Sequence, residues 1–128
     1  TFLTLPQLPG TIALFGAGDA AALLAAVGWL ESCRVFYWGD LDSHGFETLS
    51  NLRKTFPRVS SILMDENTYS THSIFAVSAS PTRATERLNL NPAELALYET
   101  LVEKGKLLEQ ERIHCGYSTP RLTAALVG

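Results

Sequence analysis

The sequence has few cysteines, no excess of positive charge and no long uninterrupted apolar run. Its two cysteines, Cys33 and Cys115, are too few for a disulfide framework, and we expect them to be buried, reduced thiols of a cytoplasmic protein. The formal net charge of −3 argues against a free-standing basic nucleic-acid binder. It does not exclude an acidic site that meets nucleic acid through a bound metal ion.

The one stretch long enough to cross a membrane, residues 11–30, is interrupted by Asp19 and three glycines. Its character also changes midway, which predicts strand, turn and helix rather than a membrane span. No basic segment precedes an apolar core, so no signal peptide is predicted. The chain starts at Thr1 in what reads as the middle of an element. We therefore expect residues 1–128 to be a single domain cut from a longer protein.

Short β-rich runs alternate with helical runs along the chain, and this alternation predicts an α/β fold. The expected architecture is a mostly parallel central sheet flanked by helices, because the second β-rich run is apolar on both faces. Residues 65–85 are expected to form a long surface connection, and 121–127 are ambiguous. Strands are expected at 11–15, 34–38 and 59–64, and helices at 20–30, 45–56, 92–104 and 107–114.

The two clearest helices have apolar residues that fall on one face. Asn91, Pro92 and Glu94 form a helix start with a capping box, and Gly105 is a natural stop. The side chains expected to be buried are Phe46, Leu49, Leu52, Phe56, Leu95, Tyr98, Leu101 and Val102. Those expected to point outward are Glu47, Asn51, Arg53 and Lys54.

Two aspartates, Asp40 and Asp42, follow the apolar strand that ends at Trp38. Gly39 allows a close approach of the backbone, and Gly45 allows the next helix to begin tightly. Ligands of open α/β sheets bind at the carboxyl ends of the strands, which is where both aspartates are expected.

Two close ionised carboxylates repel each other, so such a site must take up a proton, stay solvated or bind a cation. Mg²⁺, or Mn²⁺, suits the last option, since Mg²⁺ takes one or two carboxylates and completes its shell with water and substrate phosphates. Asp40 and Asp42 are therefore the predicted metal ligands. The plainer alternative is that Asp40 ends a strand and Asp42 only caps a helix. His44 could orient a phosphate or a water, or have no role.

These residues resemble a known motif. The run from Asp40 to Gly45 is similar to the Asp-x-Asp-x-x-Gly motif of Toprim domains, found in topoisomerases, bacterial primases and related nucleases, and its histidine resembles the topoisomerase VI branch. From about Thr1 to Leu122 the chain is similar to the C-terminal domain of the D subunit of Wadjet anti-plasmid systems. That resemblance is carried by Tyr37-Trp38-Gly39-Asp40-Leu41-Asp42-Ser43-His44-Gly45-Phe46, Leu52-Arg53, Leu63-Met64-Asp65 with Thr68, and Glu109-Gln110-Glu111-Arg112-Ile113.

The resemblance implies a Toprim-like, Mg²⁺-dependent DNA cleavage module that acts on plasmid DNA with an SMC-type complex, without a membrane. A homodimer formed through the parent protein is left open. Asp40 and Asp42 would hold the metal, with His44 and Glu111 as further catalytic candidates and Glu109 less favoured. Toprim domains also use a glutamate after their first strand. No residue here matches it, and we expect it to lie before Thr1, so the fragment could be inactive alone.

The nucleophilic tyrosine of topoisomerase VI relatives lies in a separate domain, so that role is assigned to no tyrosine of this chain. The tyrosines in question are Tyr37, Tyr69, Tyr98 and Tyr117.

A second motif favours a different class of protein. Gly16 and Gly18 follow the first expected strand and resemble a dinucleotide-binding fingerprint, with Asp40 about twenty residues further on, where a ribose-binding acid would lie. Asp19 weakens this Rossmann interpretation because it places negative charge where a phosphate should bind. The interpretation also leaves Asp42 and His44 unexplained.

A third alternative is a non-catalytic interaction module. An exposed cluster of Trp29, Trp38 and Phe75 could serve partners, although the two tryptophans are expected to be buried. Arg53, Lys54 and Arg58 could contact DNA phosphates at a helix end, or could simply be a solvated helix end that complements the helix dipole.

Overall fold

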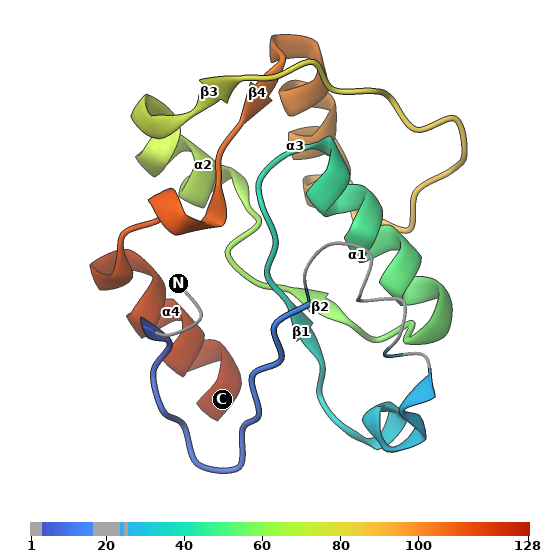
Figure 1. The fold of residues 1–128 in the computed structure, drawn as a ribbon, viewed down its shortest axis with the longest axis vertical. Helices are drawn as coiled ribbons and strands as arrows, with labels where there is room; N and C mark the ends of the chain where they lie inside the picture. Colours follow the sequence, from blue (N-terminus) through green and yellow to red (C-terminus); the bar gives the residue numbers. More distant parts are fainter. Residues whose placement is uncertain (1–3, 17–23, 25) are drawn as a thin grey trace.

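The computed structural model describes residues 4–16, 24 and 26–128, and within them α-helices alternate with very short strands (Figure 1). The α-helices are α1 (Ser43–Thr55), α2 (Glu66–His72), α3 (Pro92–Lys104) and α4 (Cys115–Val127). The strands are β1 (Phe36–Tyr37), β2 (Ser60–Ser61), β3 (Val77–Ser78) and β4 (Lys106–Leu107). Short 3-10 helices are η3 (Gly28–Ser32), η4 (Ser73–Phe75) and η5 (Gln110–Arg112).

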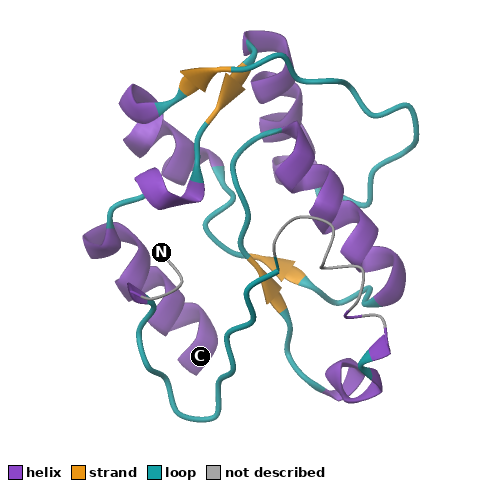
Figure 2. Ribbon diagram, viewed as in Figure 1, coloured by secondary structure: helices purple, strands orange, loops and turns teal. Residues whose placement is uncertain are grey.

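The strands form two separate two-stranded sheets (Figure 2). β1 and β2 are parallel, with Phe36 opposite Ser60, whereas β3 and β4 are antiparallel. The mixed α/β class and a parallel pairing are thus present, but the described residues do not form one mostly parallel central sheet. β2 is short because Leu63, just beyond it, has a φ of 60°, a left-handed conformation that cannot continue a strand.

The first expected strand is not formed. Residues 11–15 lie in a loop, and the side chains of Ile12, Leu14 and Phe15 are exposed. An apolar run becomes a strand only where a neighbouring strand takes its backbone hydrogen bonds, and neither sheet of the described residues includes this run. Residues 20–23 and 25 of the helix expected at 20–30 lie outside the described residues, and its described end forms the 3-10 helix η3 rather than an α-helix.

Helices α1 and α3 agree with the expectations from the sequence. Asn91 caps α3 with the full capping box, in which its side chain accepts from the N–H of Glu94 at 2.8 Å and Glu94 accepts from the N–H of Asn91 at 2.8 Å. Gly105 ends α3 in the left-handed conformation, with φ 59°. One expected core residue of α3, Leu95, is instead 40% exposed, because the buried face includes Leu97 in its place.

Two helices differ from those expectations. α2 lies in the region expected to be a surface connection, where the side chain of Asp65 caps it by accepting from the N–H of Thr68 at 2.8 Å. α4 extends from Cys115 despite Pro120 in its interior. The helix expected at 107–114 is wrong: the segment contains the end of β4 and η5 instead, because the backbone of Leu108 pairs with a distant segment rather than with its own turn.

The main core lies between α1 and α3, which run side by side in Figure 1. Phe46 meets Tyr98 edge to face, with ring centroids 6.4 Å apart. The hydroxyl of Tyr98 accepts from the N–H of Ala84 at 2.8 Å, so the one polar atom of this ring is satisfied. Other fully buried members of the core are Leu41, Leu49, Met64, Leu97, Leu101 and Leu108.

A buried ion pair joins α1, β2 and α3. Arg53, expected to point outward, donates to both carboxylate oxygens of Glu94, at 2.7 and 3.1 Å, and Ser61 donates to the same carboxylate. Burial acts to raise the pKa of Glu94, but the bonds from Arg53 and Ser61 hold this pKa below its ordinary value. The folded state is therefore stabilised by ionised Glu94, and this stabilisation is lost as the pH falls through the lowered pKa.

A second polar contact attaches the start of α4 to α2. The buried ring of His72 contacts the carbonyl oxygen of Thr68 through Nδ1 at 2.9 Å, and its Nε2 accepts from the N–H of His114 at 3.3 Å. The same ring packs edge to face on Tyr117 of α4, at 4.8 Å between centroids. One histidine thus satisfies backbone groups of two elements.

The two cysteines are not in the core. Cys33 follows η3 and Cys115 opens α4, and both are exposed, which corrects the expected burial. Each lies at the end of an element rather than on its apolar face, which explains the difference. Among the described residues no helix combines the length and apolar character needed to cross a bilayer.

We expect Arg53→Met to destabilise the protein by about 3 kcal/mol, because it leaves Glu94 buried without its cation. The neighbouring Lys54→Met is the matched control. It removes an exposed pair with Glu86 and should cost under about 1 kcal/mol. Urea unfolding at neutral pH measures both. The penalty of Arg53→Met should shrink as the pH is lowered through the pKa of Glu94, and equal effects of the two variants would contradict the assignment.

Candidate metal centre

Asp40 and Asp42 lie on the loop that joins β1 to α1, as expected from the sequence. Asp42 is also the N-cap of α1: its Oδ1 accepts from the N–H of Gly45 at 2.6 Å. Asp42 therefore does cap a helix, as the plainer interpretation of this residue proposes. A cap uses one carboxylate oxygen, and Oδ2 of Asp42 accepts no hydrogen bond from the described residues.

Gly45 is required by the close approach of α1 to this loop. A Cβ at this position would overlap the carbonyl oxygen of Asp40 and lie 3.2 Å from Oδ1 of Asp42. The glycine of the Asp-x-Asp-x-x-Gly run therefore has a steric reason. Gly39 has a related role, because a Cβ there would overlap the hydroxyl group and ring of Tyr37, the last residue of β1.

The segment containing Glu109, Gln110 and Glu111 is held against the aspartate loop. Leu41 and Leu108 exchange two backbone hydrogen bonds, of 2.9 and 3.1 Å. The N–H of Gln110 donates to Oδ1 of Asp40 at 2.8 Å. These bonds join segments about seventy residues apart in the sequence, and they bring the second acidic cluster to the first.

The neighbouring carboxylates act on the pKa of Asp40. Burial raises the pKa of Asp40 above its ordinary value, the N–H of Gln110 opposes this rise, and the nearby charges of Asp42, Glu111 and Glu109 add to it. Burial also raises the pKa of Tyr37 to about 12, with smaller contributions from the two aspartates. Negative charge therefore accumulates here without a neutralising cation from the described residues.

The remaining candidates lie around this pair with different exposure. Glu109 precedes η5 and Glu111 lies within it, and both side chains are exposed. His44 is exposed in the first turn of α1, close in sequence to Asp42. Of these three residues, Glu109 and Glu111 lie close enough for their charges to act on Asp40.

Two carboxylates are the side chains of this loop that could hold a metal ion. Among residues 4–16, 24 and 26–128, no group of three or more His, Cys, Asp and Glu side chains is arranged to hold a metal ion. Asp40 and Asp42 each retain an oxygen that no described donor engages. Two carboxylate oxygens, completed by water and phosphate, are the donor set with which Mg²⁺ binds substrates. The residues present therefore fit a substrate-completed site.

The contributions of Gln110 and Tyr37 were not predicted from the sequence. Gln110 lies between two glutamates and belongs to the resemblance, but its own contacts depend on a distant backbone pairing that no local pattern encodes. The sequence signal that could have identified Gln110 is its uncharged side chain: an amide between Glu109 and Glu111 cannot serve as a third carboxylate and can donate a hydrogen bond. Tyr37 looks like an ordinary strand residue in the sequence.

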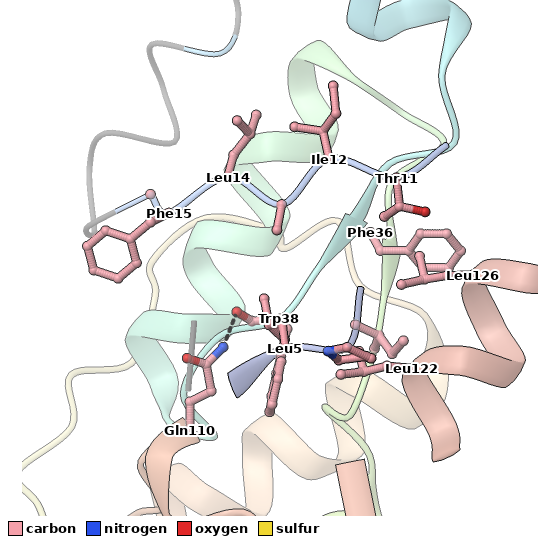
Figure 3. Close-up of a pocket in the computed structure, with 14 residues that line it drawn as sticks. Leu5, Thr11, Ile12, Leu14, Phe15, Phe36, Trp38, Gln110, Leu122 and Leu126 are labelled. Carbon is pink, nitrogen blue, oxygen red and sulfur yellow. Dashed lines mark hydrogen bonds between the residues drawn. The ribbon is translucent and has the colours of Figure 1, made fainter. Parts of the chain in front are cut away.

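A cavity of about 240 Å³ lies beside this centre, between the N-terminal segment, β1 and α4 (Figure 3). Trp38 and Gln110 line it, and the dashed line in Figure 3 marks the hydrogen bond from the Gln110 amide to the carbonyl oxygen of Trp38, at 2.9 Å. The indole N–H of Trp38 is buried and has no partner among the described residues. Most other lining residues are apolar, so the cavity adds no charged group to the centre.

The basic residues proposed for DNA contact are mostly engaged elsewhere. Arg53 pairs with Glu94, and Lys54 pairs with Glu86. Only Arg58 of that group is exposed and without an ion pair in the described part of the chain. Two of these three cations are thus held in ion pairs, and a contact of this helix end with DNA phosphates stays a prediction.

The Rossmann interpretation lacks its structural context. The strand that should precede the glycines is a loop at 11–15, and Gly16 is exposed at its end. Gly18 and Asp19 lie outside the described residues. The carboxylate of Asp40, which this interpretation assigns to a ribose, accepts instead from the N–H of Gln110.

Comparison with known proteins agrees with the motif resemblance. The model of a protein family described as Wadjet protein JetD, C-terminal, matches residues 1–122. The match spans nearly the whole chain, so the chain belongs to this family. A search of curated proteins found no match.

We expect Gly45→Ala to destabilise the protein by about 2 kcal/mol or more, since its methyl group would displace the carbonyl of Asp40 and overpack the junction. Gly28→Ala is the control, because a Cβ there meets nothing within 4 Å, and its effect should stay within about 0.5 kcal/mol. Thermal and urea unfolding measure both. A Gly45→Ala protein as stable as the parent would show that the close approach is not present in solution.

Proposed function

We propose that this chain is a metal-dependent DNA cleavage module of Toprim type, using Mg²⁺ or Mn²⁺, within a Wadjet anti-plasmid system. The observation that carries the proposal is the junction of two acidic segments, in which the loop of Asp40 and Asp42 is held by hydrogen bonds against the segment of Glu109 and Glu111. Family membership supports the Wadjet assignment. The parallel β1–β2 pair, which leads into the aspartates, supports a Toprim-like sheet.

Each residue has a task in this proposal. The free oxygens of Asp40 and Asp42 hold the cation, and their other oxygens are fixed by backbone N–H groups. When bound, a divalent cation stabilises the charge that develops on a phosphodiester during cleavage. Glu111, exposed on η5, is the candidate to accept a proton from the attacking water, and His44 is the candidate to contact a phosphate oxygen.

The partners follow from the same proposal. The substrate is plasmid DNA, delivered by an SMC-type complex, and phosphates complete the ligands of the cation. Because the centre is acidic, DNA binding by the aspartate loop should depend on the cation rather than on basic side chains.

A non-catalytic interaction module is the second candidate, favoured by exposed aromatic residues. Trp29 is 57% exposed, against the expected burial, and Phe75 is 50% exposed next to the exposed Ile74. Trp38 is half-buried, so it does not join them in an exposed cluster. Under this alternative, the acidic centre would not be needed for activity.

Cleavage by the assembled Wadjet complex separates these candidates. Asp40→Ala should reduce linearisation of a closed circular plasmid roughly a hundredfold or more, as expected for loss of a group that stabilises transition-state charge. Asp65→Ala, which removes a helix-capping aspartate that is not among the charges acting on Asp40, should cleave at nearly the normal rate. Unchanged cleavage by Asp40→Ala would rule out the catalytic role and favour the interaction module.

Cation binding can be tested without cleavage. Mg²⁺ at ten times its Kd should raise the Tm of the full-length protein by roughly 2–5 °C, since binding to the folded state adds about 1.4 kcal/mol. Asp42→Asn should abolish this rise, while Asp65→Asn should keep it. Both variants change a capping aspartate to asparagine, itself a good cap, so loss of capping affects them equally. A rise that survives in Asp42→Asn would refute the metal centre.

A further inference from the structure

Gln110 contacts the aspartate loop twice, once through its backbone and once through its side chain. Its N–H donates to Oδ1 of Asp40 at 2.8 Å, and its Nε2 donates to the carbonyl oxygen of Trp38 at 2.9 Å (Figure 3). One residue thereby holds the chain on both sides of Gly39. Together with the two bonds between Leu41 and Leu108, it fixes the turn that presents Asp40.

The side chain at this position is a neutral hydrogen-bond donor, and neither a carboxylate nor an apolar side chain could replace it. The carbonyl of Trp38 needs an N–H, and a carboxylate has none to give. A glutamate here would also add negative charge beside Asp40, Glu109 and Glu111. An amide satisfies the carbonyl and leaves the charge of the centre unchanged, whereas an apolar side chain would leave the carbonyl without this partner.

The bond to Asp40 determines which of its oxygens remains free. With Oδ1 held by the N–H of Gln110, only Oδ2 is left without a described partner. The side-chain bond to Trp38 holds Gln110 in place, so that its N–H stays directed at the carboxylate. Residues that orient metal ligands in this way contribute substantially to metal affinity.

We propose that Gln110 is a positioning residue of this centre, which orients the carboxylate of Asp40 for cation binding through its two hydrogen bonds. The inference rests on the proposed metal-dependent function and deepens it. It assigns to Gln110 an effect on cation affinity that is separate from its effect on stability.

The test is Mn²⁺ binding to the full-length protein, measured by loss of the electron paramagnetic resonance signal of the free aqua ion. Gln110→Met keeps the length of the side chain but removes the donor, and should weaken Mn²⁺ binding roughly tenfold, as is typical for partners that orient metal ligands. Gln110→Ala removes the donor without adding bulk and should act in the same direction. Plasmid cleavage should need a correspondingly higher metal concentration for half its maximal rate.

Gln7→Met is the matched control, since Gln7 is the other glutamine of the chain and its side chain is exposed. It should bind Mn²⁺ like the parent protein. Asp40→Asn defines the signal of this site: if it leaves Mn²⁺ binding unchanged, the proposed function fails, and the inference fails with it. If Asp40→Asn abolishes binding while both Gln110 variants bind normally, only the inference about Gln110 is overturned.

Stability measurements complete the test. A lower Tm in the Gln110 variants with unchanged Mn²⁺ affinity would make the residue merely structural and overturn the proposal. Loss of the folded state in both variants would do the same. Weaker Mn²⁺ binding by protein that is still folded at the assay temperature would support it.

Discussion

Two backbone hydrogen bonds between Leu41 and Leu108 are the constraint on which the acidic centre depends. Both leucine side chains are fully buried, so the junction is anchored in the hydrophobic core. In an extended segment, residues i and i+2 lie on one side and the residue between them on the other. The burial of Leu41 therefore leaves Asp40 and Asp42 together on the outer side, where the segment from Leu108 onward brings Glu109 and Glu111.

The surroundings of Glu94 and Asp40 explain why the pKa values of these two carboxylates shift in opposite directions. Glu94 lies in a structural contact where the chain supplies Arg53, and its pKa is held below the ordinary value despite burial. The pKa of Asp40 is raised by burial and by its acidic neighbours, with only a backbone N–H to oppose them. The chain thus neutralises the carboxylate that holds α1 to α3, whereas no described cation forms an ion pair with the aspartate loop.

The features that could be predicted from the sequence are those that depend on local chemistry. The cap at Asn91, the stop at Gly105 and the strand-end aspartates with Gly45 all follow from residues a few positions apart. Prediction failed where a distant partner decides the outcome. Residues 11–15 are apolar enough for a strand but join no described sheet. Residues 107–114 do not form the expected helix because Leu108 pairs with Leu41. The contacts of Gln110 depend on the same pairing.

In the proposed metal centre, backbone N–H groups hold both carboxylates before any cation binds, and this helps to explain how two side chains alone could hold a metal ion. Oδ1 of Asp42 is fixed by the N–H of Gly45 and Oδ1 of Asp40 by the N–H of Gln110, so both carboxylate orientations are set by backbone groups. Fixed ligands lose little conformational freedom on binding, which favours a cation that only two side chains hold. The remaining coordination positions are then free for phosphate oxygens. Under the proposed function, tight association of the cation would await the nucleic acid, and metal binding would be coupled to the presence of the substrate.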